Sequence, residues 1–211
     1  MAQPGKAFPV LATPRLRLRQ FEARDLRGLH ACFGDPEAMR FWDLPTSASM
    51  AETQRVLTWL AKTNSPYDHL GWAVTERAKD QCIGMVCYHH REARNKRLEL
   101  GYILAPQHQG KGYGTEAVQA MLDHCVGVLG TRRVHALVHP GNAASIRLLQ
   151  RLGFRCEGGP LTDYWCVGSE YRDAMLYAFV ARTDAPAPAG TAQAGKKADQ
   201  GRPRKTGRPA S

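Results

Sequence analysis

The sequence predicts a single domain of the mixed α/β (α+β) class, in which strands lead into helices. Alternation of polar and apolar residues at every second position, as in residues 15–21 and 97–105, is typical of half-buried strands. Apolar residues at intervals of three and four, as in residues 117–129, indicate a helix that buries one face. A chain of 211 residues can bury a sizeable core in one domain without disulfides or metals.

The individual elements follow from these patterns and from their end signals. Pro14 precedes the first strand, and Ser49-Met50-Ala51-Glu52 fits a capping box that begins a helix. Asn142 fits a helix N-cap, and Gly153 fits the C-terminal end of the same helix. We expect strands at residues 15–21, 69–76, 81–89, 97–105, 133–138, 154–157, 164–167 and 173–180, and helices from the capping box to about residue 62, at 117–129 and from Asn142 to 152.

The chain divides into three parts: an N-terminal extension at 1–14, a folded domain at 15–180 and a tail at 181–211. The tail consists almost wholly of Ala, Pro, Gly, Thr, Lys, Arg and Gln, and it has no large apolar side chain to bury, so we expect it to be disordered. Seven basic and two acidic residues give the tail half of the net charge of +10. The modest positive charge of the body suits a ligand that carries several phosphates.

Several classes of protein are not expected. No stretch of about 18 apolar residues and no N-terminal apolar segment is present, so we expect a cytoplasmic protein. The six cysteines lack the paired spacing of zinc sites, and the eight histidines, including the pair His89 and His90, lack helical metal spacing. We therefore expect no metal, and we leave open whether the two histidines face a substrate or solvent.

The segment that says most about a ligand is the glycine-rich turn of residues 109–116, between a predicted strand and a predicted helix. Unpaired N–H groups and the helix dipole attract an anion at a helix N-terminus, and glycines let a phosphate approach the main chain closely. The spacing fits neither GxxxxGK[ST] nor GxGxxG. The turn therefore predicts a diphosphate ligand outside the two common nucleotide motifs.

Gln109, Gly112 and Gly114 match the Q/R-x-x-G-x-G/A signature, and the turn resembles that of the GCN5-related N-acetyltransferase (GNAT) superfamily. Residues 98–104 resemble the preceding strand of its RimJ/RimL-type branch, which acetylates the N-termini of ribosomal proteins. Residues 142–149 resemble the Asn-x-x-Ser helix of that branch, and residues 171–177 fit its closing strand. The motifs occur in family order within residues 15–180.

The resemblance implies a mixed, mostly antiparallel sheet that splays open, with acetyl-CoA as cosubstrate in the gap. Main-chain groups near Ile103 and Leu104 would contact the pantetheine arm, and the amides of the turn would bind the pyrophosphate. Lys111 either adds charge there or is a solvated lysine, and Asn142 either binds the pantetheine or only caps its helix. The implied cofactor-binding residues are Ile103, Leu104, Gln109, Gly110, Lys111, Gly112, Tyr113, Gly114, Thr115 and Asn142.

Acetyl transfer requires a neutral amine, stabilisation of the oxyanion and a proton for the leaving thiolate. Glu99, a polar residue on the strand before the turn, is the expected general base, directly or through water; the alternative is a surface glutamate paired with Arg97 or another base. By the resemblance, Ser145 is the proton donor, unless it is an ordinary helix residue. Many superfamily members carry a tyrosine where this chain has Leu149, so that role is not carried over.

The acceptor is predicted from the cost of deprotonation. An α-amine with a pKa near 7.8 costs about 1 kcal/mol to deprotonate at pH 7, whereas a lysine near 10.4 costs about 4.6 kcal/mol. A site without an obvious strong base favours protein N-termini. A small-molecule amine (antibiotic, polyamine or amino acid) and a non-catalytic acyl-CoA-binding module remain alternatives.

Gly-Arg-Pro at 201–203 and 207–209 resembles AT-hook cores, which leaves weak nucleic-acid contact by the tail as a further alternative. The oligomeric state stays open.

Overall fold

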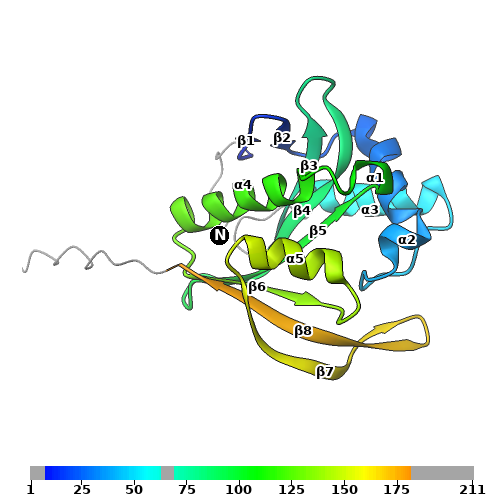
Figure 1. The fold of residues 1–211 in the computed structure, drawn as a ribbon. Helices are drawn as coiled ribbons and strands as arrows, with labels where there is room; N and C mark the ends of the chain where they lie inside the picture. The colour runs from blue at the N-terminus through cyan, green and yellow to red at the C-terminus, as the bar shows by residue number, and fades with distance from the viewer. Residues whose placement is uncertain (1–7, 63–68, 182–211) are drawn as a thin grey trace, which may run out of the picture.

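The computed structural model describes residues 8–62 and 69–181, whose centre is an eight-stranded sheet with helices on both faces (Figure 1). The spatial order of the strands is β1-β2-β3-β4-β5-β6-β8-β7, and all neighbours are antiparallel except β5 and β6. The strands are β1 (Leu11–Ala12), β2 (Leu16–Arg19), β3 (Leu70–Glu76), β4 (Gln81–Glu92), β5 (Arg97–Leu104), β6 (Arg133–Val138), β7 (Arg155–Val167) and β8 (Glu170–Val180). The helices are η1 (Ala23–Asp25), α1 (Leu26–Phe33), α2 (Pro36–Met39), α3 (Met50–Lys62), η2 (Pro106–His108), α4 (Tyr113–Gly127) and α5 (Ala143–Arg151).

The sheet opens between β5 and β6. These two strands pair only at their first residues, from Arg97 with Arg133 to Glu99 with His135. Beyond that point β5 continues alongside β4, and β6 continues alongside β8, so the two halves of the sheet diverge (Figure 1). The predicted splayed, mostly antiparallel sheet is confirmed, and the residue pair Glu99 and His135 marks the vertex of the gap.

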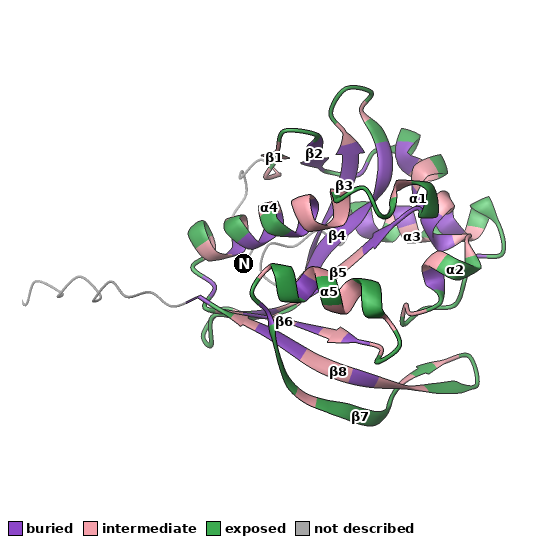
Figure 2. Ribbon diagram, viewed as in Figure 1, coloured by how far each residue is buried: buried purple, intermediate pink, exposed green. Residues whose placement is uncertain are grey.

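Two apolar clusters hold the site strands from both faces. Successive side chains of β5 point to opposite faces of the sheet. The even-numbered side chains face α4 and α5, and the Ile103 side chain faces α1 and α3. Figure 2 shows the central strands as buried along most of their length. Each fully buried aliphatic side chain contributes about 1.5–3 kcal/mol to folding, so β5 is a firm support for the site. Members of the first cluster include Leu98, Leu100, Leu104, Met121 and Leu149, and members of the second include Leu29, Leu57, Met85 and Ile103.

Two parts of the fold differ from the sequence-based expectation. No local pattern predicted α1 and α2, because both are short, α1 contains Gly28 and ends at Gly34, and α2 begins with Pro36. The Asp35 side chain caps α2 by accepting the Ala38 N–H at 2.8 Å. The prediction of two strands at 154–157 and 164–167 is wrong, since β7 runs continuously through this region. Its pairing with β8 shifts register at three places, and these irregularities accommodate Pro160 within a strand.

The ends of the described region add two observations. Within the predicted N-terminal extension, β1 pairs with β2 at the edge of the sheet. Ala181, the first residue of the predicted tail, is buried and donates its N–H to the Arg132 carbonyl at 2.8 Å. The rest of the predicted tail, residues 182–211, lies outside the described residues. Among the residues that the structure does describe, none forms a helix long and apolar enough to span a membrane.

Candidate active site

The glycine turn leads directly into α4, and within residues 8–62 and 69–181 no side chain caps the start of that helix. Gly112 is the N-cap residue and adopts a left-handed conformation with φ 80°. Gly110 is also left-handed, with φ 71°, and no atom of the described residues lies within 4 Å of the position where its Cβ would be. Residues with a Cβ avoid this region, so the conformation explains both glycines. The first amides of α4 are therefore available to an anion.

The turn is held in place by the segment that precedes β2. Glu116, in the first turn of α4, accepts the Thr13 hydroxyl at 2.6 Å, the Arg15 backbone N–H at 2.9 Å and the Arg15 guanidinium at 2.6 Å. Arg15 also donates to the Lys111 carbonyl at 2.9 Å and lies 4.6 Å from the centre of the Tyr113 ring. We call Thr13, Arg15 and Glu116 the turn clamp. It was not predicted, because no local pattern links residues so far apart in the chain.

One edge of β5 faces the gap. The N–H of Ala105 donates to a carbonyl of β4 at 3.0 Å, and the main-chain groups of an antiparallel strand alternate in direction. The main-chain N–H and C=O groups of Ile103 consequently point to β4, and those of Tyr102 and Leu104 point to the gap. The Gln109 side chain donates to the Leu104 carbonyl at 2.9 Å, which ties the turn to this edge. Of the two strand residues predicted for the pantetheine arm, Leu104 has the suitable direction.

Glu99 lies at the vertex of the gap, in one row with His89 on β4 and His135 on β6. Its carboxylate oxygens lie 3.5 Å from His135 Nε2, 4.0 Å from His89 Nε2 and 3.2 Å from His90 Nδ1. Burial tends to raise the pKa of Glu99, but the hydrogen bond from His135, the charge of His89 and the contact with His90 outweigh it and lower the pKa. Arg97, its suggested partner, pairs with Glu92 instead.

Ser145 approaches the gap from α5, on the other face of the sheet. Its N–H donates to the Asn142 side chain at 3.1 Å, which confirms the predicted N-cap. Its hydroxyl lies 2.7 Å from the Tyr102 hydroxyl. Burial raises the pKa of Tyr102 to about 12, so this phenol stays protonated. Because Tyr102 and Glu99 have opposite parity on β5, the hydroxyl pair and the carboxylate lie on opposite faces.

The Tyr102 hydroxyl was not predicted as part of the site, although one signal was present in the sequence. It is the polar group on a face of β5 that otherwise carries Leu98, Leu100 and Leu104. A polar tip on such a face needs a hydrogen-bond partner when it is buried. Leu149, at the family's tyrosine position, is completely buried in the core.

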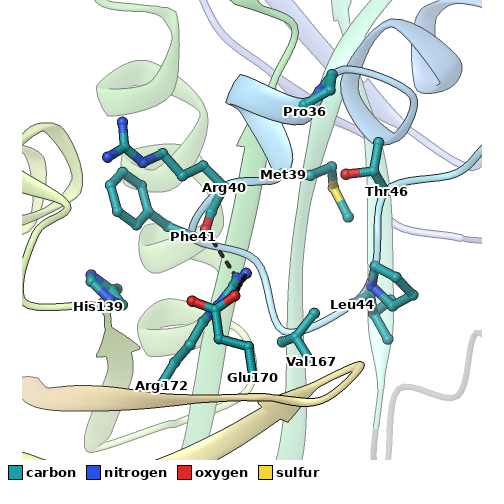
Figure 3. A pocket seen from close by; sticks show the side chains of 11 residues that line it. Pro36, Met39, Arg40, Phe41, Leu44, Thr46, His139, Val167, Glu170 and Arg172 are labelled. Atoms are coloured by element: carbon teal, nitrogen blue, oxygen red, sulfur yellow. Dashed lines mark hydrogen bonds and ion pairs between the residues drawn. The ribbon is translucent and has the colours of Figure 1, made fainter.

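A cleft of about 440 Å³ lies between the segment after α2, the end of β6 and the turn from β7 to β8 (Figure 3). Arg172 donates to the Arg40 carbonyl at 2.9 Å and to the Trp42 carbonyl at 3.2 Å, which joins β8 to that segment. The Trp42 ring lies 3.8 Å from where a Cβ would stand on Gly101, two residues from Glu99. Trp42 thus connects a residue of the cleft lining, Arg172, to the strand that carries Glu99. It is lined by Pro36, Met39, Arg40, Phe41, Leu44, Pro45, Thr46, His139, Val167, Glu170 and Arg172.

Comparison with known proteins identifies the family to which this fold belongs. Residues 15–155 match the family model described as the acetyltransferase (GNAT) domain, and the chain therefore belongs to the GNAT acetyltransferases. It is 30% identical over 173 residues to the uncharacterized N-acetyltransferase YoaA of Bacillus subtilis, covering 82% of this chain and 97% of that protein.

Two further relatives differ in what they act on. The spermidine N(1)-acetyltransferase of Escherichia coli is 26% identical over 165 residues, which covers 76% of this chain and 83% of the relative. The ribosomal-protein-serine acetyltransferase of Escherichia coli is 33% identical over 100 residues, which covers 47% of this chain and 55% of the relative.

Among solved structures, spermidine N-acetyltransferase from Vibrio cholerae in complex with CoA and spermine superposes with a TM-score of 0.68 at 23% identity, and the match covers 80% of this chain and 96% of that one. This likeness shows the shared fold. Together with the family match, the comparisons identify an acetyl-CoA-dependent N-acetyltransferase in which acetyl-CoA is the cosubstrate.

Proposed function

We propose that this enzyme acetylates a primary α-amine, the N-terminus of a protein, as the RimJ/RimL branch does. The acetyl-CoA pyrophosphate would lie over the uncapped first turn of α4, where N–H groups and the helix dipole favour an anion. The pantetheine arm would run along the free edge of β5, where Tyr102 and Leu104 direct their main-chain groups. The proposed contacts in the turn and on α5 are Gln109, Gly110, Lys111, Gly112, Tyr113, Gly114, Thr115 and Asn142.

Glu99 is the proposed base. The position of the carboxylate at the vertex supports this role, because that is where a thioester carried along β5 would meet an amine from the cleft. A neutral α-amine attacks the carbonyl, the N–C bond forms, and the nitrogen then loses a proton. That proton is more acidic than in the free ammonium ion, so an ionised carboxylate can accept it, directly or through water.

Ser145 is the proposed proton donor to the leaving thiolate. In this scheme Tyr102, held in its protonated form, would donate to the Ser145 oxygen 2.7 Å away, which would leave the Ser145 hydrogen free to point into the gap. The serine would transfer or share this proton as the C–S bond breaks. Tyr102 acts in this scheme as a positioning residue.

Transfer to a polyamine is the second candidate, because a spermidine acetyltransferase is among the relatives. The charged side chains that line the cleft are Arg40, Arg172 and Glu170, and Glu170 is bound by Arg172 at 2.8 Å. No carboxylate of this lining is left unpaired to bind a polycation. The lining therefore supports an α-amine over spermidine.

The test incubates the full chain with isotopically labelled acetyl-CoA and one acceptor at a time. The acceptors are a peptide with a free N-terminus, the same peptide with its N-terminus blocked but a lysine side chain left free, spermidine, and single amino acids. We expect label on the free α-amine and little on the lysine. A Glu99→Gln variant should lower kcat about 10²-fold. Label on spermidine alone would favour the second candidate, and tight CoA binding without any transfer would favour a non-catalytic module.

A further inference from the structure

Two histidines that are neighbours in the sequence, His89 and His90, both contact the carboxylate of Glu99, which a regular strand does not allow. Successive side chains of a strand point to opposite faces. The pairing of β4 with β5 is irregular between His89 and Glu92, and His90 adopts a left-handed backbone with φ 50°. This bulge turns the His90 ring onto the face that carries His89 and Glu99.

The bulge brings three donor groups to separations that suit one metal ion. His89 Nδ1 and His90 Nδ1 are 3.2 Å apart, and His90 Nδ1 is 3.2 Å from Glu99 Oε2. One ligand atom from each of the three residues can be chosen so that all lie within 4.8 Å of one another. Donors bound at 2.0–2.1 Å to a tetrahedral Zn²⁺ ion are about 3.3–3.4 Å apart. Two edges of such a tetrahedron are thus nearly formed.

We propose that His89, His90 and Glu99 bind one divalent transition-metal ion of the zinc class, and that the bound ion inhibits acetyl transfer by occupying the Glu99 carboxylate. Imidazole and carboxylate are suitable ligands for such ions. His135 keeps its Nε2 on the same carboxylate at 3.5 Å and orients it. The site revises the expectation of no metal, because spacing rules for helices and cysteine pairs do not describe adjacent histidines on a bulged strand.

Binding is tested first without acetyl-CoA or acceptor. Co²⁺ is titrated into the untagged full chain and followed by visible absorption, with Zn²⁺ as competitor. We expect about one ion per chain, and His90→Gln should weaken binding more than about tenfold. The His90 side chain is 75% exposed, so this variant should fold normally. His124→Gln, on α4, is the matched control and should bind as the unaltered chain does.

An unchanged absorption spectrum, or equal affinity in His90→Gln, would overturn the metal site.

The inhibition, unlike the binding, rests on the proposed role of Glu99. It is tested by following acetylated product by mass, because the thiol of released CoA itself binds zinc. Zn²⁺ at site-filling concentration should suppress product, EDTA should restore it, and His90→Gln should require at least tenfold more Zn²⁺. Full turnover with the site filled would refute the inhibition, whereas an inactive preparation that binds Co²⁺ would count against the acceptor assignment and leave the metal site standing.

Discussion

The hydrogen bond between Tyr102 and Ser145 gives the sharpest quantitative prediction. Ser145→Ala removes the proposed acid, and loss of a general acid lowers kcat about 10²-fold or more. Tyr102→Phe removes one hydrogen bond of 2.7 Å. Such a bond contributes about 0.5–1.5 kcal/mol, which corresponds to a fall in kcat of about 2- to 12-fold. The KM for acetyl-CoA should change little in either variant.

The two effects should not add. If Tyr102 acts only by directing the Ser145 proton, Tyr102→Phe has nothing left to affect once Ser145 is alanine, and the double variant should match Ser145→Ala. Rates are measured as thiol release under saturating acetyl-CoA, with the melting temperature as a control for folding. A thioester with a more acidic leaving thiol should restore much of the rate of Ser145→Ala, because that thiolate needs no proton.

Three outcomes would refute this reasoning. The first is an unchanged kcat in Ser145→Ala. The second is a double variant in which the effects of Ser145→Ala and Tyr102→Phe on kcat simply multiply. The third is a loss of rate in Ser145→Ala that is the same for thioesters with acidic and with ordinary leaving thiols. Any of them would remove Ser145 from proton transfer and leave its contact with Tyr102 as a packing feature of α5 against β5.

Three further predictions concern the glycine turn and the ion pair of Arg19 with Asp80. Gly112→Ala places a Cβ on a left-handed residue, at a cost of about 1–2 kcal/mol, and should raise the KM for acetyl-CoA about 5- to 30-fold with little change in kcat; an unchanged KM would contradict the assigned turn. Glu116→Gln weakens the turn clamp at Arg15, whose side chain is 48% exposed, and should raise the same KM only a few-fold; a collapse of kcat instead would point to a different role. Burial tends to raise the pKa of Asp80, but the hydrogen bond and charge of Arg19 outweigh burial and lower this pKa. The ion pair therefore stabilises the fold fully above the ordinary carboxyl pKa of about 3.9. This stabilisation is lost as the pH falls through the lower pKa of the folded state. Urea midpoints below pH 4 should consequently fall more steeply in the unaltered chain than in Asp80→Asn, and parallel curves would argue against the linkage.

Much of the half of the fold that contains the glycine turn follows from local sequence. The boundaries of β6 are those predicted, because its apolar and polar residues alternate without interruption. Asn142 caps α5 as predicted, since a short polar side chain can bond to the N–H three residues later. The glycines of the turn lie where the backbone is left-handed. In each case the cause acts over a few residues.

Contacts across the chain account for what was not predicted. Tyr102 and Ser145 are 43 residues apart in sequence, and Thr13 and Glu116 are 103 apart. Whether such side chains meet depends on strand order and register, which local patterns do not specify. The bulge that turns His90 toward Glu99 is likewise set by the pairing of β4 with β5.

The sequence by itself determined the order of most elements, the left-handed glycine turn before α4 and the family to which the chain belongs, because these depend on residues close together along the chain. Only the tertiary structure decided that β5 and β6 part at Glu99, that one histidine pair converges on that carboxylate, and that a strand tyrosine reaches the α5 serine. Those features arise where separate segments pack side by side, and their geometry is fixed by the register and twist of the whole sheet.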